Sequence, residues 1–310
     1  MKIITLTLNP AIDRHGVAQA RDESAKTPIR ITSEAAAGKG VNLSRALVAL
    51  DLPNRALVVL GSENAESFKS ALSKDRIDGI YLEVEGQIRE NVTIHSEDLS
   101  EEHVSSSGFS ADDSLLARVS EALEGLIDAN TVIALSGSLP TGVSASATAA
   151  LLRQMKKMGA RIVIDSRSFT LDDIKTVHPW LIKPNEEEVA LYSDREVTDL
   201  DSAALAANDL RRDCAENVMI SLGGAGAVLA SADGIFAANA PKVKVLSTVG
   251  AGDSSIAGFL AAAREGCSYP DMLKRAIACG SAACMTEGTR PPEKEAVLRL
   301  IDTITVKKAE

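Results

Sequence analysis

The sequence has few aromatic residues, few cysteines and no long uncharged apolar segment. Phe, Trp and Tyr together make up 3% of the 310 residues, so the core must be built from Ala, Val, Ile and Leu, and few rings can stack on bases or sugars. No run of eighteen uncharged apolar residues occurs, so no membrane span is expected. The four cysteines show no Cys-x-x-Cys spacing, which favours free thiols over disulfides or a metal site.

Positive charge is also in deficit. Lys and Arg number 33 against 43 Asp and Glu, giving a formal net charge of −10, and this balance excludes a partner with a phosphate backbone such as nucleic acid. The opening residues 1–6 contain one lysine and few apolar residues, so we expect a first strand there rather than a signal peptide, and a cytoplasmic protein.

Short apolar runs alternate with segments of helical spacing along the chain. This alternation predicts an α/β fold with a mainly parallel sheet covered by helices on both faces. The expected buried strands are Ile3–Leu8, Arg55–Leu60, Thr131–Leu135, Arg161–Asp165, Trp180–Lys183 and Asn217–Ser221, and the expected helices between them are Val41–Leu50, Ala65–Ser73, Ser144–Met158 and Ala203–Cys214. From Gly252 onward only helices are expected, over Asp253–Arg264, Tyr269–Met285 and Glu293–Thr303.

Two polar segments interrupt the alternation, at about residues 11–34 and 87–110. Both lack a helical stripe but contain strand-like pieces such as Asn91–Ile94. Insertions of this size in an α/β domain are usually functional. We expect them to form one small β-sheet lid, within a single domain that covers residues 1–310.

The strongest local motif is Ser247–Ser254, which contains Gly250, Ala251 and Gly252 directly before a predicted helix. Small residues there allow backbone N–H groups to converge at a helix N-terminus, which suits a phosphoryl group. Asp253 follows at the first turn. From the local residues alone it is either a general base for an attacking hydroxyl or a helix cap.

A second glycine-rich segment, Ala36–Asn42, opens a helix but is not a Walker loop, because the Gly-Lys-Ser/Thr ending is absent. Gly38 and Gly40 allow close backbone approach, while Lys39 and Asn42 offer hydrogen-bond donors to hydroxyls or phosphate. A plain glycine-rich helix entry explains the same residues.

Two more loops follow predicted strands. In Lys183–Glu188, Asn185 and Glu188 stand three apart at a helix start and could hold magnesium through water, with Lys183 toward phosphate; the acidic residues could equally complement the helix dipole. Ser221–Gly226 is a glycine-rich strand end that suits a nucleotide. Several such loops at strand ends of one sheet favour phosphoryl transfer.

At this point the chain resembles a known family. Ser247–Leu260 resembles the C-terminal signature of the PfkB branch of ribokinase-like sugar kinases at every defined position, and Ala37–Ser44 is similar to its N-terminal signature. The resemblance runs through nearly the whole chain. It implies a ribokinase-like three-layer α/β/α fold with a small β-sheet lid, ATP and Mg²⁺ as cofactors, and a homodimer formed through the lid.

Within the family, Thr7–Asp13, Ser136–Pro140 and Leu181–Glu188 resemble segments of the phosphosugar kinases. This implies transfer of the γ-phosphoryl group of ATP to a hydroxymethyl group of a ketohexose monophosphate. Fructose 1-phosphate, giving fructose 1,6-bisphosphate, stands ahead of tagatose 6-phosphate and fructose 6-phosphate. The motifs are common to all three activities and do not separate them.

The resemblance also implies a role for each site residue. Asp253 would be the base, and the amides of Gly250, Ala251 and Gly252 would stabilise the transferring phosphoryl group. The sugar would be held by Asp13, Gly38, Lys39 and Asn42, its phosphate by Arg89, ATP by Lys183, Asn185, Ser221, Gly223 and Gly226, and magnesium through water by Asn185 and Glu188.

Three residues depart from the family pattern: Asp51 at a helix end, Ile88 before Arg89 where relatives have threonine, and Gly224–Ala225 in the nucleotide loop. Other functions fit less well. A kinase of an unphosphorylated sugar or nucleoside is disfavoured by the opening motif and Arg89. A non-catalytic sugar-phosphate sensor has no need of Asp253, and a dinucleotide-dependent oxidoreductase would need a glycine fingerprint after the first strand.

Overall fold

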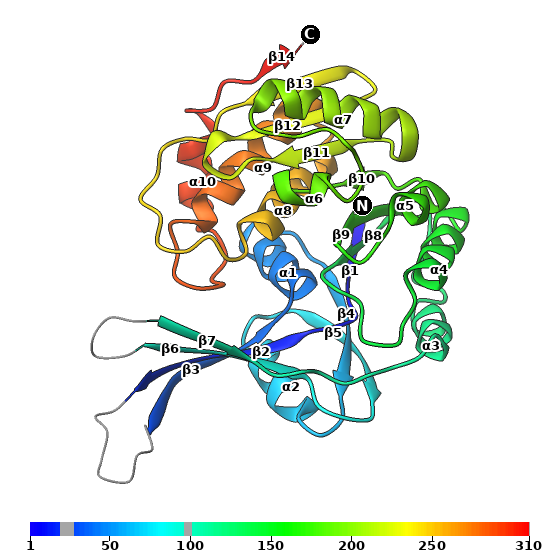
Figure 1. The fold of residues 1–310 in the computed structure, drawn as a ribbon, viewed down its shortest axis with the longest axis vertical. Helices are drawn as coiled ribbons and strands as arrows, with labels where there is room; N and C mark the ends of the chain where they lie inside the picture. Colours follow the sequence, from blue (N-terminus) through cyan, green and yellow to red (C-terminus); the bar gives the residue numbers. More distant parts are fainter. Residues whose placement is uncertain (19–27, 96–100, 310) are drawn as a thin grey trace.

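The computed structural model describes residues 1–18, 28–95 and 101–309, which form a large sheet, a small sheet and the helices around them (Figure 1). The large sheet has ten strands. In spatial order they are β14 (Lys307–Ala309), β13 (Gly234–Ala238), β12 (Ala227–Ser231), β11 (Val218–Ser221), β10 (Leu181–Ile182), β9 (Arg161–Asp165), β8 (Thr131–Ser136), β1 (Lys2–Thr7), β4 (Arg55–Gly61) and β5 (Asp78–Val84). The strands from β11 to β5 pair in parallel, and β12, β13 and β14 continue the sheet antiparallel.

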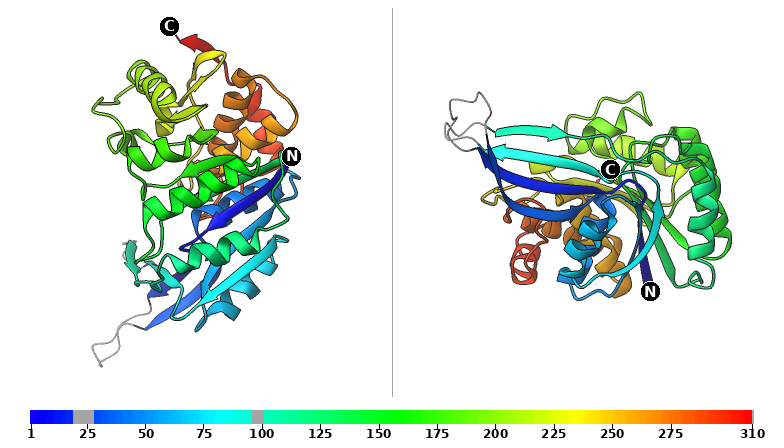
Figure 2. Two further views of the ribbon diagram at one scale, coloured as in Figure 1. Left: turned by 90° about the vertical axis from the view of Figure 1, so that its right-hand side faces the viewer. Right: turned by 90° about the horizontal axis from the view of Figure 1, so that it is seen from below.

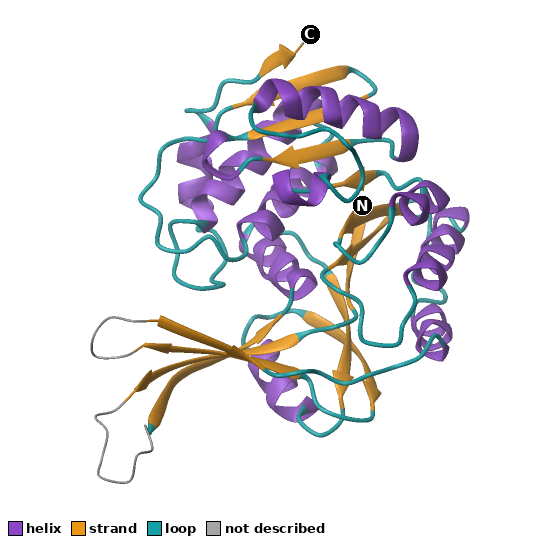
Figure 3. Cartoon of the chain, viewed as in Figure 1, coloured by secondary structure: helices purple, strands orange, loops and turns teal. Residues whose placement is uncertain are grey.

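Apolar side chains alternate between the two faces of the large sheet along its central strands, so the core lies on both sides of the sheet. In β1, Ile3 packs in one apolar cluster and Ile4 in the other, because successive side chains of a strand point to opposite faces. One face is covered by α3 (Ser114–Ala122), α4 (Ala145–Lys157), α5 (Leu171–Val177) and α7 (Leu200–Cys214), and the other by α1 (Lys39–Ala49), α2 (Ala65–Ser73), α8 (Ala251–Arg264), α9 (Tyr269–Ala283) and α10 (Lys294–Ile301). Helices flank the strands on both sides (Figure 3), so the predicted three-layer α/β/α fold is confirmed.

The two polar excursions come together as the second sheet, in the order β3 (Ile29–Ala37), β2 (Ala11–Ala18), β6 (Arg89–His95) and β7 (Glu101–Ser105). Residues 19–27 and 96–100 of the excursions lie outside the described residues. The small sheet extends beyond the helices of the body (Figure 2), and the expectation of one small sheet built from both excursions is confirmed.

The strand register gives the small sheet two faces. Ala11 pairs with Arg89 and Asp13 with Asn91, so these side chains share one face, called here the inner face. A Cβ placed on Gly288 would lie 3.8 Å from His15 Nε2, so the loop after α9 reaches this face. The opposite, outer face carries three exposed apolar side chains: Ile29, Ile31 and Val104.

The expectation that only helices follow Gly252 is wrong at the chain's end. Lys307 and Lys308 lie in β14, which pairs antiparallel with β13. The segment has no apolar alternation to indicate a strand; it is held by backbone pairing at a sheet edge, where exposed lysines are typical. The hairpin β12–β13 and helices α3 and α5 were not predicted either. Among the described residues, none of the helices combines the length and the hydropathy needed to span a bilayer.

Candidate active site

Charged side chains gather where parallel strands of the large sheet end. Asp165 is the last residue of β9, and Lys183 follows β10 directly. Both are almost fully buried, at 2% and 4% exposure. Helices α1 and α8 begin beside them, so the carboxyl edge of the sheet and two helix N-termini meet at one place, as is usual for ligand sites in open α/β sheets.

The α8 residue Asp253 is buried, at 4% exposure. Its Oδ2 accepts a hydrogen bond from Asn42 Nδ2 on α1 at 3.1 Å. Burial, together with the negative charge of Asp165, raises the pKa of Asp253 to about 7, although Lys39, Asn42 and Lys183 act in the opposite direction. Asp253 is the third residue of α8, and no side-chain cap is formed at this helix start within the described chain. Its carboxylate is therefore held by another helix and does not cap its own.

The N-terminus of α8 carries backbone N–H groups that have no partner inside the helix. Gly250 is the N-cap residue with φ 79°, a left-handed conformation that favours glycine. The Ala251 amide donates to Thr248 O at 3.3 Å. Within the described residues, the amides of Gly250, Gly252 and Asp253 make no backbone hydrogen bond at this helix start.

Lys183 lies against this helix start. A Cβ placed on Gly252 would come within 3.1 Å of Lys183 Nζ, so the absence of a side chain at Gly252 makes room for the ammonium group. Lys183 Nζ is 3.5 Å from Asp165 Oδ1. The lysine thus stands beside the free amides of α8, where an anion would bind.

A second ammonium group faces the same carboxylate. Lys39 Nζ lies 3.4 Å from Asp165 Oδ1 and 3.7 Å from Glu188 Oε1. Partial burial opposes its charge, but Asp165, Glu188 and Asp253 outweigh that effect and raise the pKa of Lys39. Asp165 Oδ2, by contrast, has no hydrogen-bond partner within the described residues. A buried carboxylate oxygen of this kind can accept a water, a hydroxyl or a cation.

The loop after β10 forms the other wall of the site and leads into α6 (Glu186–Val189). Asn185 Oδ1 accepts from the Glu188 amide at 2.7 Å, and Glu188 Oε2 accepts from the Asn185 amide at 3.2 Å. This capping box fixes both side chains. Ser221, at the end of β11, forms a parallel bridge with Asn185, so the predicted ATP-binding residues of two loops are adjacent.

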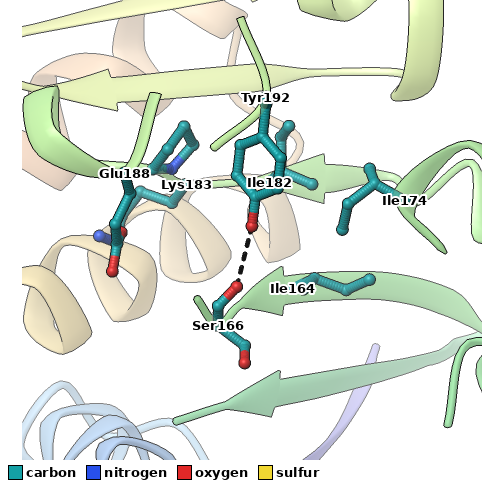
Figure 4. Close-up of a pocket in the computed structure, with 8 residues that line it drawn as sticks. Ile164, Ser166, Ile174, Ile182, Lys183, Glu188 and Tyr192 are labelled. Carbon is teal, nitrogen blue, oxygen red and sulfur yellow. Dashed lines mark hydrogen bonds between the residues drawn. The ribbon is translucent and has the colours of Figure 1, made fainter. Parts of the chain in front are cut away.

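Behind Lys183 and Glu188 lies a cavity of about 10 Å³, roughly the space for a single water molecule (Figure 4). Tyr192 closes one side and donates its hydroxyl to Ser166 O at 2.9 Å. The side chains of Lys183 and Glu188 are therefore packed with little empty space behind them.

The glycines at the start of α1 and in the loop after β11 are needed for different reasons. A Cβ on Gly40 would lie 2.3 Å from Thr7 Oγ1, and one on Gly226 would lie 2.1 Å from Ala238 O, so close packing explains both. Gly38 has φ 127°, and a Cβ there would meet Thr7 Cγ2 at 2.9 Å. Gly223 has φ 52° and open space around it, which leaves its backbone accessible.

Two predicted sugar-binding residues lie on the inner face of the small sheet. Asp13 Oδ1 accepts from Asn91 Nδ2 at 2.8 Å, and Asn91 Oδ1 in turn accepts from Ser105 Oγ at 3.0 Å. Arg89 Nε donates to Pro10 O at 3.3 Å. These contacts lie within the small sheet and the residues just before β2. The other predicted residues come together at the carboxyl edge of the large sheet, where α1 and α8 begin: Lys39, Asn42, Lys183 and Asp253.

Sequence reasoning missed three residues that these contacts single out: Asp165, Asn91 and Arg45, whose guanidinium bonds Asn42. For Asp165 a signal was present, because a carboxylate that closes a buried apolar strand lies at the ligand-binding edge of a parallel sheet. Arg45 and Asn91 gave none.

Known proteins are similar to this chain along most of its length. The chain matches the pfkB family carbohydrate kinase profile over residues 7–296. It is 29% identical over 305 residues to a 1-phosphofructokinase from Vibrio cholerae, covering 98% of this chain and 96% of that protein. It is also 29% identical over 294 residues to ATP-dependent 6-phosphofructokinase isozyme 2 from Escherichia coli, covering 94% of each chain.

The fold agrees with a solved structure as well. Phosphofructokinase-2 from Escherichia coli, crystallised in complex with substrates and products, superposes with a TM-score of 0.85 at 26% identity and covers 98% of this chain and 99% of its own. The match of the family profile to most of the chain, and of relatives to nearly all of it, establishes that this protein belongs to the pfkB family of carbohydrate kinases and is a phosphotransferase.

Proposed function

We propose that this kinase transfers the γ-phosphoryl group of ATP to the free hydroxymethyl group of a ketohexose monophosphate, with fructose 1-phosphate as the preferred acceptor and fructose 1,6-bisphosphate as the product. The observation that carries the proposal is Asp253, a buried carboxylate held by Asn42 beside two ammonium groups at a helix N-terminus. A carboxylate would repel phosphate there unless it accepts the proton of the attacking hydroxyl.

The proposed chemistry assigns a task to each part of the site. The acceptor hydroxyl gives its proton to Asp253 as its oxygen attacks the γ-phosphorus, and the bond from that phosphorus to the bridging oxygen breaks to release ADP. The amides of Gly250, Gly252 and Asp253 at the start of α8, together with Lys183, stabilise the negative charge on the transferring group. Lys39 supplies a further positive charge at 3.4 Å from Asp165.

Nucleotide binding is assigned to the loops that meet beside Asn185. The bridge to Ser221 and the open backbone of Gly223 offer polar groups to the nucleotide, while Gly226 shapes the turn. Lys183 links these loops to α8, so it serves the phosphates of ATP.

The site also fits magnesium. Glu188 Oε1 and the unpartnered Asp165 Oδ2 are oxygen donors of the kind Mg²⁺ prefers. Among the described residues no three His, Cys, Asp or Glu side chains form a metal cage, so the ion would be held largely by water and phosphate oxygens, with Asn185 acting by fixing Glu188. When bound, magnesium would offset phosphate charge.

The small sheet is proposed as a lid that supplies the sugar contacts. Its inner face carries Asp13 for a sugar hydroxyl and Arg89 for the phosphate of the acceptor. Together with Gly38, Lys39 and Asn42 they complete an acceptor site between the two sheets, within one kinase domain over residues 1–310. The protein would work where ATP is available, in the cytoplasm.

The acceptor is tested by ADP release with ATP and magnesium against fructose 1-phosphate, tagatose 6-phosphate, fructose 6-phosphate and ribose. We expect kcat/KM for fructose 1-phosphate to exceed the others by about a hundredfold or more, equivalent to about 2.7 kcal/mol of transition-state preference. A preference for fructose 6-phosphate or tagatose 6-phosphate would replace the acceptor and keep the chemistry. Sugar-phosphate binding without any turnover would overturn the proposal in favour of a sensor.

A further inference from the structure

Arg45 is a buried charged side chain that no motif accounts for. It lies on α1, three residues after Asn42, and is 7% exposed. Its Nε donates to Asp75 Oδ2 at 2.6 Å, its Nη1 donates to Asn42 Oδ1 at 3.2 Å, and its Nη2 donates to Ala36 O. The three acceptors come from the segment after α2, from α1 and from β3, so the planar guanidinium is fixed on three sides.

This contact decides which way the Asn42 amide points. An arginine can only donate hydrogen bonds, so the Asn42 atom that faces Arg45 must be the oxygen. The amide nitrogen is thereby turned to the opposite side, where it donates to Asp253 Oδ2. A rotated amide would present its oxygen to the carboxylate of Asp253, and two acceptors would then face each other.

The other charged groups that face Asp253 are held independently of Arg45. Lys39 stands at the start of α1, Asp165 at the end of β9 and Lys183 after β10, and the two lysines are paired with Asp165. Changing Arg45 therefore alters the surroundings of Asp253 chiefly through Asn42.

We infer that Arg45 is a positioning residue for the reaction: its hydrogen bond to Asn42 fixes the amide so that Asn42 donates to Asp253. The inference rests on the proposed role of Asp253 as base, and it adds that a side chain outside the substrate site sets the state of that base. Asp75, 28% exposed in its side chain, anchors Arg45 from the surface.

The test is Arg45→Met, measured as kcat/KM against pH with the best acceptor. The hydrogen bond donated by Asn42 favours the charged form of Asp253, so its loss should raise the pKa of that carboxylate. The acid limb of the pH profile, where kcat/KM falls as the pH drops, should then move to higher pH by about one unit. At pH 7, kcat/KM should fall about 10- to 100-fold, the range for losing a hydrogen bond to a charged group. Arg45→Lys keeps one donor and should recover part of the loss.

A double-mutant cycle separates positioning from support of the fold. In an Asn42→Ala background, Arg45→Met should lower kcat/KM by less than about threefold further, because the two residues act through one contact. The matched control is Arg55→Met: Arg55 Nε also lies 2.6 Å from an aspartate oxygen, Asp78 Oδ2, but on β4 and β5 away from Asn42. Its pH profile should equal that of the wild type.

An unmoved acid limb in Arg45→Met, or a full additional loss in the Asn42→Ala background, would overturn the inference. If Arg45→Met does not fold, Asp75→Asn, which loosens Arg45 from the surface, should shift the limb the same way by a smaller amount, and an unchanged limb there overturns it too. Failure of the proposed function would look different, because the wild type itself would show no turnover.

Discussion

The polar residues of the two sheets are held in contrasting ways. At the edge of the large sheet, Asp165, Lys183 and Asp253 are each 4% exposed or less, and each lies beside a partner or an opposite charge. On the inner face of the small sheet, Asp13 and Arg89 are half-buried, and among the described residues their side chains bond to Asn91 of the same sheet and to Pro10. The small sheet extends away from the body in every view (Figures 1 and 2).

This difference separates the parts of the site that the fold assembles from the parts that a ligand must assemble. Buried charges persist only when neighbouring charges and hydrogen bonds offset their desolvation, so the groups around Asp253 are already arranged before any substrate binds. Half-exposed groups are screened by water and bind weakly until they are covered. We therefore expect the large sheet to determine the rate of phosphoryl transfer and the small sheet to determine affinity for the sugar phosphate.

The largest effect should follow removal of the base. Asp253→Asn keeps the shape and a hydrogen-bonding group but cannot take a proton, so kcat should fall about 10²- to 10⁴-fold, the usual contribution of a general base. Steady-state kinetics give kcat, and calorimetry of ATP binding provides the control, since binding should persist. Near-normal turnover would remove Asp253 from the chemistry.

The pH profile of the wild type checks the same residue without a mutation. The pKa of Asp253 is raised to about 7 by burial and Asp165, and the base must be ionised to act. Activity should thus be retained above pH 7 and fall as the pH drops through that value, approaching about tenfold per unit well below it. A rate that stays constant down to pH 5 would contradict this.

A smaller effect, confined to affinity, should follow a change on the small sheet. Arg89→Ala should raise KM for the sugar phosphate by about 5- to 150-fold, corresponding to about 1–3 kcal/mol for a lost charge-assisted contact, with kcat nearly unchanged. Arg14→Ala is the matched control, because Arg14 lies on the neighbouring strand but faces outward and pairs with Glu34 and Glu90. An unchanged KM in Arg89→Ala would exclude this arginine from the acceptor site.

The division between the two sheets also explains what the sequence could predict. Local periodicity was enough for the central strands and helices, and α2 spans the predicted Ala65–Ser73 without any shift. The small residues before Asp253 and the loop from Lys183 to Glu188 could be recognised as candidate phosphate sites from the sequence, because such a site at a helix start needs a particular local composition. For residues of this kind, the adjacent sequence is enough to indicate the function.

Residues whose role comes from a distant partner carried no such signal. Arg45 depends on Asp75, thirty positions along the chain, and on a carbonyl of the small sheet. Asn91 becomes meaningful only through the register that places it beside Asp13. The edge strand β14 is defined by its pairing with β13. The sequence around Lys307 and Lys308 is polar and by itself predicts a solvent-exposed tail. Each of these needs tertiary contacts that a single sequence does not display.

The smallest effect on catalysis should come from the outer face of the small sheet, which we propose as the contact in a homodimer. Ile29 and Ile31 on β3 and Val104 on β7 are 41%, 46% and 48% exposed on this one face, and large apolar side chains exposed along both edges of one sheet face suit an association surface. Ile31→Glu should shift the mass in light scattering from twice the 32.5 kDa protomer to a single protomer, while kcat stays within about twofold because the inner face and Asp253 are untouched. The control is Leu298→Glu, which changes a leucine on α10 that is 54% exposed, and it should leave the dimer intact. A dimer that survives Ile31→Glu would place the interface elsewhere and contradict the assignment of separate tasks to the two faces of the small sheet.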